Sequence, residues 1–340
     1  TGGGGIAQKG SVCDPFKKAM GVTGAQNPQG DAFDIDYVAH EIGHQFGADH
    51  TFNSATNACG NGNRVAASAY EPGSGSTIMG YAGLCGSDNL QSQGDVYFHA
   101  RSLEQITGFL ASGGGCGTGS ATGQTPPTLP AFSSAYHIPF LTSFELPAPQ
   151  PADGQTWCWE EWDLSNTEFS WAQSRLTAPL FRSFTPDTSP VRVFPALSKL
   201  VNNITAYTGE KLPDTARQLR FRLTVRHVHN GLGSFNFPDD QVTLHVIRTT
   251  APFRVTMPDV AAVSWAGGSI QTVTWDVGGT DAAPVGCSLV DIHLSVDGGY
   301  TYPVPVASGL PNPGAAVITV PNVNTTSTAR IKIKAQGNVF

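Results

Sequence analysis

The sequence HEIGHQFGADH, residues 40–50, holds three histidines and one glutamate at fixed spacings. On a helix, His40 and His44 lie one turn apart on the same face. Two imidazoles at that spacing can bind one zinc ion. The neighbouring Glu41 is offset enough to miss the ion and reach a water molecule. This stretch therefore predicts a zinc site with a carboxylate beside the metal.

The residues after the second histidine extend this prediction. The helix is expected to span 34–46, with Asp34 or Asp36 as its cap. Gly47 ends it and permits a sharp turn that brings in His50 as a third ligand. The fourth coordination position then stays open, as catalytic zinc requires. A bare HExxH pattern often arises by chance, but the added glycine and histidine favour zinc binding over three unrelated histidines.

A second motif, STIMGYAG at residues 76–83, places a methionine in a turn of small residues. After a zinc helix of this kind, it resembles the Met-turn of the metzincin peptidases. The resemblance implies that Met79 lies beneath the histidines as an apolar floor. It also implies that Tyr81 binds zinc weakly or donates a hydrogen bond to the tetrahedral intermediate. Packing in the pocket wall is the alternative role for this tyrosine.

Composition and periodicity divide the chain into three folded parts. Residues 1–117 carry the histidine motif and two helical patterns, and 118–130 form a linker rich in Gly, Ser, Thr and Pro. Apolar and polar residues alternate most clearly in RQLRFRLTVRHV at 217–228, which predicts an antiparallel β-sandwich over 131–249. A further set of alternating strands predicts a second sandwich over 250–340. The expected fold class is multidomain α+β.

Charge and cysteine content narrow the possible functions. The net charge of −7, with no cluster of Lys or Arg, gives no electrostatic basis for nucleic-acid binding. No apolar run is long enough to span a membrane. The six cysteines are well spaced and form no CxxC pair, which favours disulfides and an oxidising compartment over buried free thiols.

The last helix of the first domain is predicted from Tyr97 to Leu110. Its apolar stripe, Leu103, Ile106 and Leu110, is expected to pack under the active site. We expect His99, near the start of this helix, to be structural and not a metal ligand.

Nearly the whole chain resembles secreted bacterial reprolysin-like (adamalysin-like) metallopeptidases with C-terminal Ig-like and fibronectin-type-III-like domains. The resemblance implies a secreted zinc endopeptidase that hydrolyses peptide bonds in proteins, with Glu41 as general base. It rests on GGGGIAQKGSVC (2–13), MGVTGAQ (20–26), VAHEIGHQFGADHTFN (38–53), STIMGYAGLCG (76–86) and YFHARSLEQI (97–106), and in the later domains on WCWEEWDL (157–164), GEKLPDTARQLRFRLTVRH (209–227) and residues 273–303.

The same resemblance implies two disulfides that brace the cleft. Cys158 and Cys287 fall in different predicted domains and are left without partners. The implied pairs are Cys13 with Cys116 and Cys59 with Cys85.

The chain departs from this family at three places. Thr51 follows the third histidine, where typical adamalysins have aspartate. Residues 2–8 resemble the edge strand that pairs with substrate, and 19–24 the last strand before the zinc helix, but the earlier strands and helix of the family have no counterpart. The last sandwich also stops at least one strand early. We therefore expect a chain truncated at both ends, with a missing N-terminal segment as a partner.

The alternative function is a catalytically incomplete surface adhesion or matrix-binding protein that uses its β-sandwich domains. Trp157, Trp159 and Trp162 are expected to include solvent-exposed members that form a binding surface. The complete ligand set and Glu41 favour the enzyme, because a relic tends to lose one of them.

Overall fold

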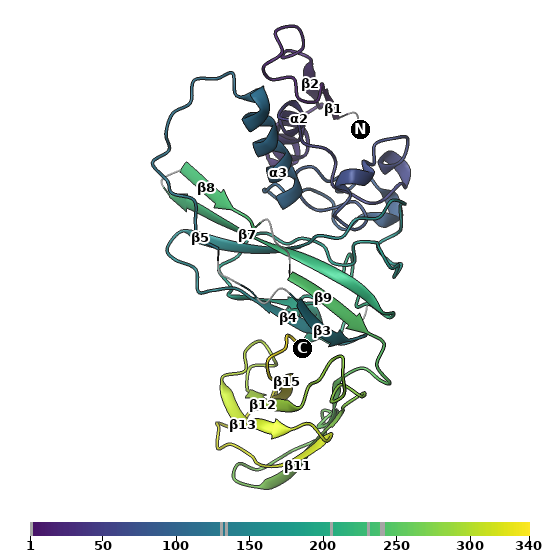
Figure 1. Ribbon diagram of the computed structural model, residues 1–340, viewed down its shortest axis with the longest axis vertical. Helices are drawn as coiled ribbons and strands as arrows, with labels where there is room; N and C mark the ends of the chain where they lie inside the picture. Colours follow the sequence, from purple (N-terminus) through teal and green to yellow (C-terminus); the bar gives the residue numbers. More distant parts are fainter. Residues whose placement is uncertain (1–2, 130–131, 133–134, 205–206, 230–231, 239–241) are drawn as a thin grey trace.

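A computed structural model describes the chain except for residues 1–2, 130–131, 133–134, 205–206, 230–231 and 239–241. The fold is mixed and mostly β, with few helices and several sheets. Three parts follow one another along the long axis, from the N-terminus at one end to the last strands at the other (Figure 1). We call them the first, middle and last parts, using the boundaries predicted from the sequence.

The first part opens with a hairpin and one continuous helical run. Strands β1 and β2 pair antiparallel. The run begins three residues earlier than predicted, and its N-cap Gly30 makes no side-chain cap hydrogen bond. Asp36 accepts a hydrogen bond from Gly94 N at 2.7 Å and caps nothing, so the predicted aspartate cap is wrong. The elements are β1 (Gly4–Ala7), β2 (Gly21–Gly24), α1 (Asp31–Phe33), the π-helical η1 (Asp34–Ala39) and α2 (His40–Gln45).

The helical run ends where the sequence predicted, because Gly47 takes a φ of 93°. The chain from there to α3 is irregular, with three short 3₁₀ turns. Both disulfides implied by the family resemblance are present, with Cα–Cα distances of 5.5 and 5.2 Å: Cys13–Cys116 and Cys59–Cys85. The turns are η2 (Asn57–Cys59), η3 (Ala66–Ser68) and η4 (Gly86–Asp88).

Helix α3 (Ala100–Phe109) begins three residues later than predicted, because the His99 side chain caps it by accepting a hydrogen bond from Arg101 N. It continues into η5 (Leu110–Gly114). Ile106 packs against the apolar cluster that contains Met79, as the stripe predicted. Leu110 is 40 % exposed and is not part of that cluster, so the prediction that it packs under the site is wrong.

The middle part contains a five-stranded sheet in the order β3-β9-β7-β5, with β8 also paired to β7, and a two-stranded sheet, β4-β6. The prediction of purely antiparallel strands is wrong at β3–β9, which pair parallel. The elements are β3 (Ala135–Pro139), β4 (Phe144–Pro147), β5 (Gln155–Glu161), β6 (Val191–Phe194), α4 (Leu197–Leu200), β7 (Arg217–His229), β8 (Leu232–Asn236) and β9 (Val242–Ile247).

The last part contains two three-stranded antiparallel sheets, β10-β11-β14 and β13-β12-β15. Side chains from both sheets and from the middle part form a single apolar cluster. The Phe253 and Phe340 rings, 5.3 Å apart, lie where the two parts meet. The elements are β10 (Arg254–Met257), β11 (Ile270–Asp276), β12 (Leu289–Ser295), β13 (Val304–Pro311), β14 (Ala315–Thr319) and β15 (Arg330–Ala335).

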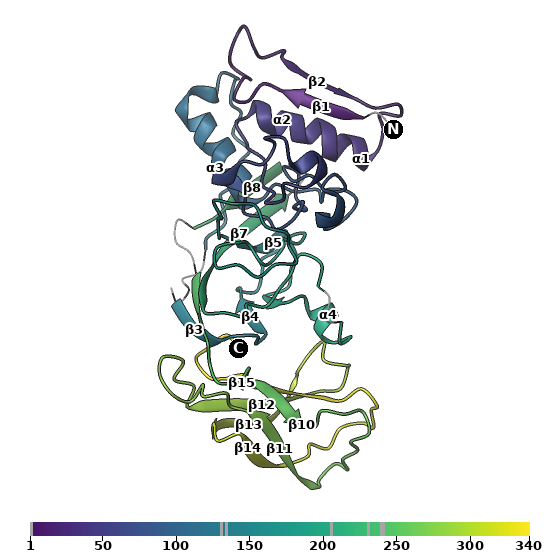
Figure 2. The same ribbon diagram turned by 90° about the vertical axis from the view of Figure 1, so that its right-hand side faces the viewer.

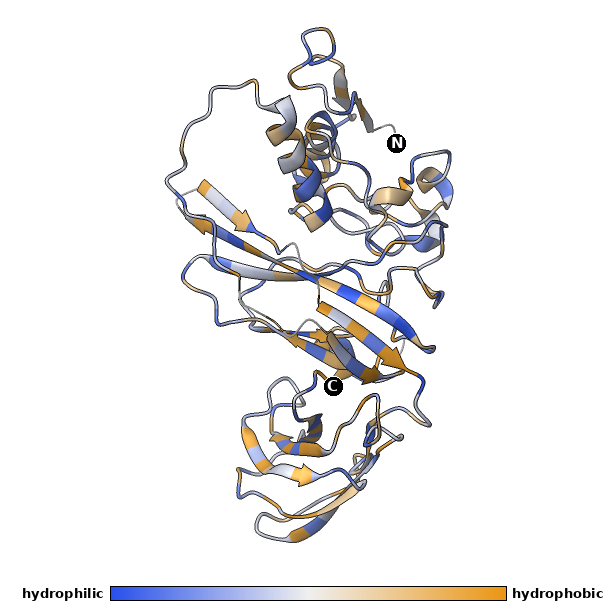
Figure 3. Cartoon of the chain, viewed as in Figure 1, coloured by the Kyte–Doolittle hydropathy of each residue, from blue (hydrophilic) through white to orange (hydrophobic). Residues whose placement is uncertain are grey.

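Both faces of strand β7 are in contact with other parts of the molecule: one packs into the core of the middle part and the other contacts the first part. Hydropathy alternates along the strand, as Figure 3 shows. The apolar face predicted from the sequence is confirmed, since its four side chains are fully buried in the middle part: Leu219, Phe221, Leu223 and Val225.

The opposite face of β7 meets the first part, and α3 lies beside the β7–β8 end of the sheet in both ribbon views (Figures 1 and 2). Arg222 donates to Glu104 of α3 at 3.2 Å, and its guanidinium lies 3.7 Å from the Trp162 ring centroid. Trp162 in turn stacks on Tyr70 of the first part.

Burial of the three tryptophans corrects a prediction. Trp157, Trp159 and Trp162 are 6, 4 and 6 % exposed. The first two belong to the core of the middle part, and the third lies against the first part. They therefore offer no exposed aromatic surface for adhesion.

We expect Leu223→Ala to lower the free energy of unfolding by about 2–5 kcal/mol, because it opens a cavity in the core that β7 completes. Leu176→Ala is the matched control, since Leu176 is 63 % exposed, and should cost less than about 1 kcal/mol. Urea denaturation followed by tryptophan fluorescence measures both. Equal losses would contradict the core assignment.

Candidate metal centre

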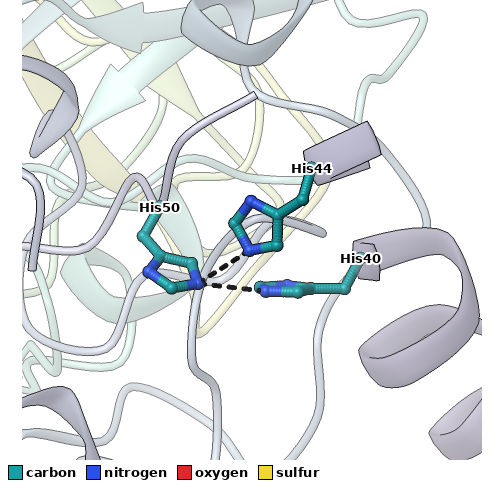
Figure 4. A group of neighbouring side chains, drawn as sticks. All are labelled: His40, His44 and His50. Atoms are coloured by element: carbon teal, nitrogen blue, oxygen red, sulfur yellow. Dashed lines mark hydrogen bonds between the residues drawn. The ribbon is translucent and has the colours of Figure 1, made fainter. Parts of the chain in front are cut away.

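Three imidazoles converge at the end of the helical run (Figure 4). His40 and His44 project from the same face of α2, with ring centroids 4.8 Å apart. The turn at Gly47 then brings His50 back, so that its Nε2 lies 3.0 Å from that of His44 and 3.2 Å from that of His40. The structure thus brings together all three predicted ligands.

The other ring nitrogen of each histidine bonds to a backbone carbonyl. A carbonyl only accepts, so each Nδ1 carries the proton and each Nε2 presents a lone pair to the common centre. Lone pairs that face one another at about 3 Å suit a cation between them. The Nδ1–O distances are 2.7 Å for His40 to Ile78, 2.8 Å for His44 to Ala48 and 2.6 Å for His50 to Asn63.

Electrostatics keep these imidazoles in the neutral, metal-binding form. Burial, and after it the charge of His44, lower the pKa of His40 to about 3 and that of His50 to about 4. Burial also lowers the pKa of His44. In the described part of the chain, this is the one group of three or more His, Cys, Asp or Glu side chains whose donor atoms lie within 4.8 Å of one another. The donor set fits zinc.

Glu41 directly follows His40 in α2, and its carboxylate lies against β1. A Cβ on Gly5 would overlap this carboxylate, so a larger residue there would displace it. Its Oε2 is buried without a hydrogen-bond partner, and burial raises the pKa of Glu41 to about 7. A carboxylate with that pKa can both take up and release a proton near neutral pH.

Tyr81 forms part of the wall of the centre. Its ring centroid lies 4.5 Å from that of His50, 5.6 Å from that of His40 and 4.6 Å from that of Phe52. Burial raises the pKa of the Tyr81 phenol, and the charge of Glu41 adds to this. The phenol therefore keeps its proton at neutral pH and can donate a hydrogen bond.

Met79 is fully buried beneath α2. A Cβ on Gly43 would lie 2.5 Å from its sulfur, so the helix needs glycine for this approach. The Met79 carbonyl accepts a hydrogen bond from Thr51 N at 3.1 Å, which joins the methionine turn to the segment after His50.

Sequence reasoning missed the residues that surround these groups. Gly5 and Gly43 give no signal beyond a glycine inside a strand or helix, where glycine is otherwise unfavourable. The backbone carbonyl groups that orient the imidazoles give no signal in the sequence, since every residue carries a carbonyl group.

Comparison with known proteins agrees with this geometry. Residues 2–110 match the family model described as metallo-peptidase family M12B, reprolysin-like. This match supports a reprolysin-like metallopeptidase domain over those residues, and this family implies a metal cofactor, typically zinc. No curated protein matches the chain significantly. None of the described helices is long and apolar enough to cross a membrane.

We expect His40→Ala to weaken zinc binding at least about 100-fold, because two imidazoles remain where three converged. His137→Ala is the control, since this histidine lies on β3 in the middle part, and should leave binding unchanged. Competition with a chromophoric chelator measures both affinities. Undiminished zinc binding by the His40 variant would contradict this prediction and would indicate a second strong zinc site.

Proposed function

We propose that the chain is a secreted zinc-dependent endopeptidase. The observation that carries the proposal is the convergence of three imidazole nitrogens, with Glu41 directly after the first of these histidines in α2. Burial, which raises the pKa of Glu41 to about 7, supports its role as the base. A general base near neutral pH next to a metal centre is what hydrolysis of a peptide bond by water requires.

In this mechanism His40, His44 and His50 would hold the ion. Zinc bound there would supply Lewis-acid activation of the attacking water and of the scissile carbonyl. Glu41 takes the proton from that water and delivers it to the leaving amine nitrogen. Tyr81 donates a hydrogen bond to the oxyanion that develops as the carbonyl carbon becomes tetrahedral.

The substrate is expected to lie extended along β1. This strand borders Glu41 through Gly5, and a free strand edge binds a peptide through backbone hydrogen bonds. The segment Met79–Leu84 supplies the wall of the pocket for the side chain after the scissile bond.

The middle and last parts are proposed to be an Ig-like and a fibronectin-type-III-like β-sandwich. The presence of two sheets in each part supports this arrangement. The two disulfides are consistent with an extracellular location. The adhesion alternative is not favoured, because the ligand set is complete and the tryptophans assigned to a binding surface are buried.

We expect Glu41→Gln to lower casein hydrolysis by about 10²–10⁴-fold, because the amide cannot accept the proton. Zinc content should stay at the wild-type level, since Glu41 is not a ligand. Glu168→Gln in the middle part serves as the control. Near-normal turnover by the Glu41 variant would refute the assignment of the base.

Metal removal gives a separate test. A zinc chelator should abolish cleavage by the wild-type chain, and added zinc should restore it, because the ion supplies the Lewis acid. Cleavage that persists in excess chelator would exclude a metallopeptidase mechanism.

A further inference from the structure

A buried carboxylate close to the metal centre takes no part in the mechanism above. Glu71 is 1 % exposed, and burying a carboxylate is costly unless hydrogen bonds replace its water. Four donors from three residues meet this need. Its oxygens accept from Thr51 Oγ1 at 2.5 Å, Ser76 N at 2.9 Å, Thr77 N at 3.2 Å and Thr77 Oγ1 at 2.6 Å.

These donors come from the two segments that carry or orient metal ligands. Thr51 directly follows His50. Thr77 directly precedes Ile78, whose carbonyl accepts the Nδ1 proton of His40. The Glu71 carboxylate therefore joins the segment of the third imidazole to the segment that aims the first.

Backbone hydrogen bonds place the carboxylate between these segments. Glu71 N donates to Thr51 O at 2.9 Å. Gly75, at a φ of 66°, passes so close that a Cβ there would lie 3.0 Å from Glu71 Oε2. Ser76 also donates through Oγ to Ser183 O of the middle part at 3.1 Å, which continues the network beyond the first part.

The side chain of Thr51 explains why a distant glutamate is needed. Its hydroxyl is here a donor, so it needs an acceptor, as do the two Thr77 donors. Glu71, twenty residues further along the chain, supplies the acceptor for all of them.

We infer that Glu71 is a positioning residue of the metal centre. Its carboxylate holds His50 in register with the carbonyl that orients His40, so that the imidazoles converge. This inference concerns metal binding directly, and its effect on turnover rests on the proposed function.

The first test is Glu71→Gln, which keeps the shape but turns an NH₂ group toward donors. We expect zinc affinity, measured against a chromophoric chelator, to fall about 10–100-fold. At saturating zinc, kcat should fall while KM changes little, because the ligands are misaligned and the strand that binds substrate is untouched.

The matched control is Glu161→Gln in the middle part. Glu161 is equally buried, and among the described residues it accepts hydrogen bonds from Leu180 N and Phe181 N and pairs with Arg217, all in the middle part. This variant should lower the melting temperature and leave zinc affinity at the wild-type value. The same pattern in Glu71→Gln, lower stability with normal zinc affinity, would overturn the inference.

A double variant makes the test more specific. The double variant Thr51→Asp, Glu71→Gln moves the carboxylate from residue 71 to its hydrogen-bond partner, residue 51. Its zinc affinity should be at least about tenfold higher than that of Glu71→Gln. Thr51→Asp alone sets two buried carboxylates against each other and should weaken zinc binding. A double variant no better than Glu71→Gln would count against a positioning role for the charge.

If Glu71→Gln does not accumulate as folded protein, Thr51→Val is tested in its place. This variant removes the hydroxyl that donates to Glu71 and keeps the side-chain volume. Zinc affinity should then fall several-fold, and unchanged affinity would reject the inference. Wild-type chain that binds zinc but cleaves no protein would refute the proposed function and leave the zinc-affinity test of Glu71 intact.

Discussion

The metal centre depends on one type of interaction, the hydrogen bond from an imidazole Nδ1–H to a backbone carbonyl. Each bond sets the tautomer of its ring and directs the Nε2 lone pair inward. The three accepting carbonyls belong to Ala48, Asn63 and Ile78, and none lies in a regular helix or strand. The site is therefore as well ordered as the loops that carry these carbonyls.

Those loops are held by links of different chemistry. The Cys59–Cys85 disulfide joins the segment after His50 to the segment after Met79. Glu71 joins the same regions through hydrogen bonds at a second place. Two such links across irregular chain restrict its motion more than either does alone, because each shortens the segment left free.

The middle part extends this support from outside the first part. Arg64 donates to Ser165 O at 2.7 Å and to Asn53 Oδ1 at 2.9 Å, immediately after the residue whose carbonyl orients His50. Glu160 accepts from Ala100 N, at the start of α3, and from Thr224 Oγ1 of β7. The face of β5 and β7 that meets the first part is thus polar yet buried, and its hydrogen bonds are specific to this partner surface.

Local patterns in the sequence determined much of the metal centre. The pairing of His40 with His44 and the alternation in β7 follow from helix and strand periodicity, and the return of His50 follows from the positive φ that glycine permits at Gly47. The disulfide pairs followed from the family resemblance. Tertiary structure alone decided that β3 and β9 run parallel, that Trp162 is buried against the first part, and that Glu71 serves the centre. Periodicity shows which side chains share a face, but burial and hydrogen bonding depend on what the rest of the chain brings to that face.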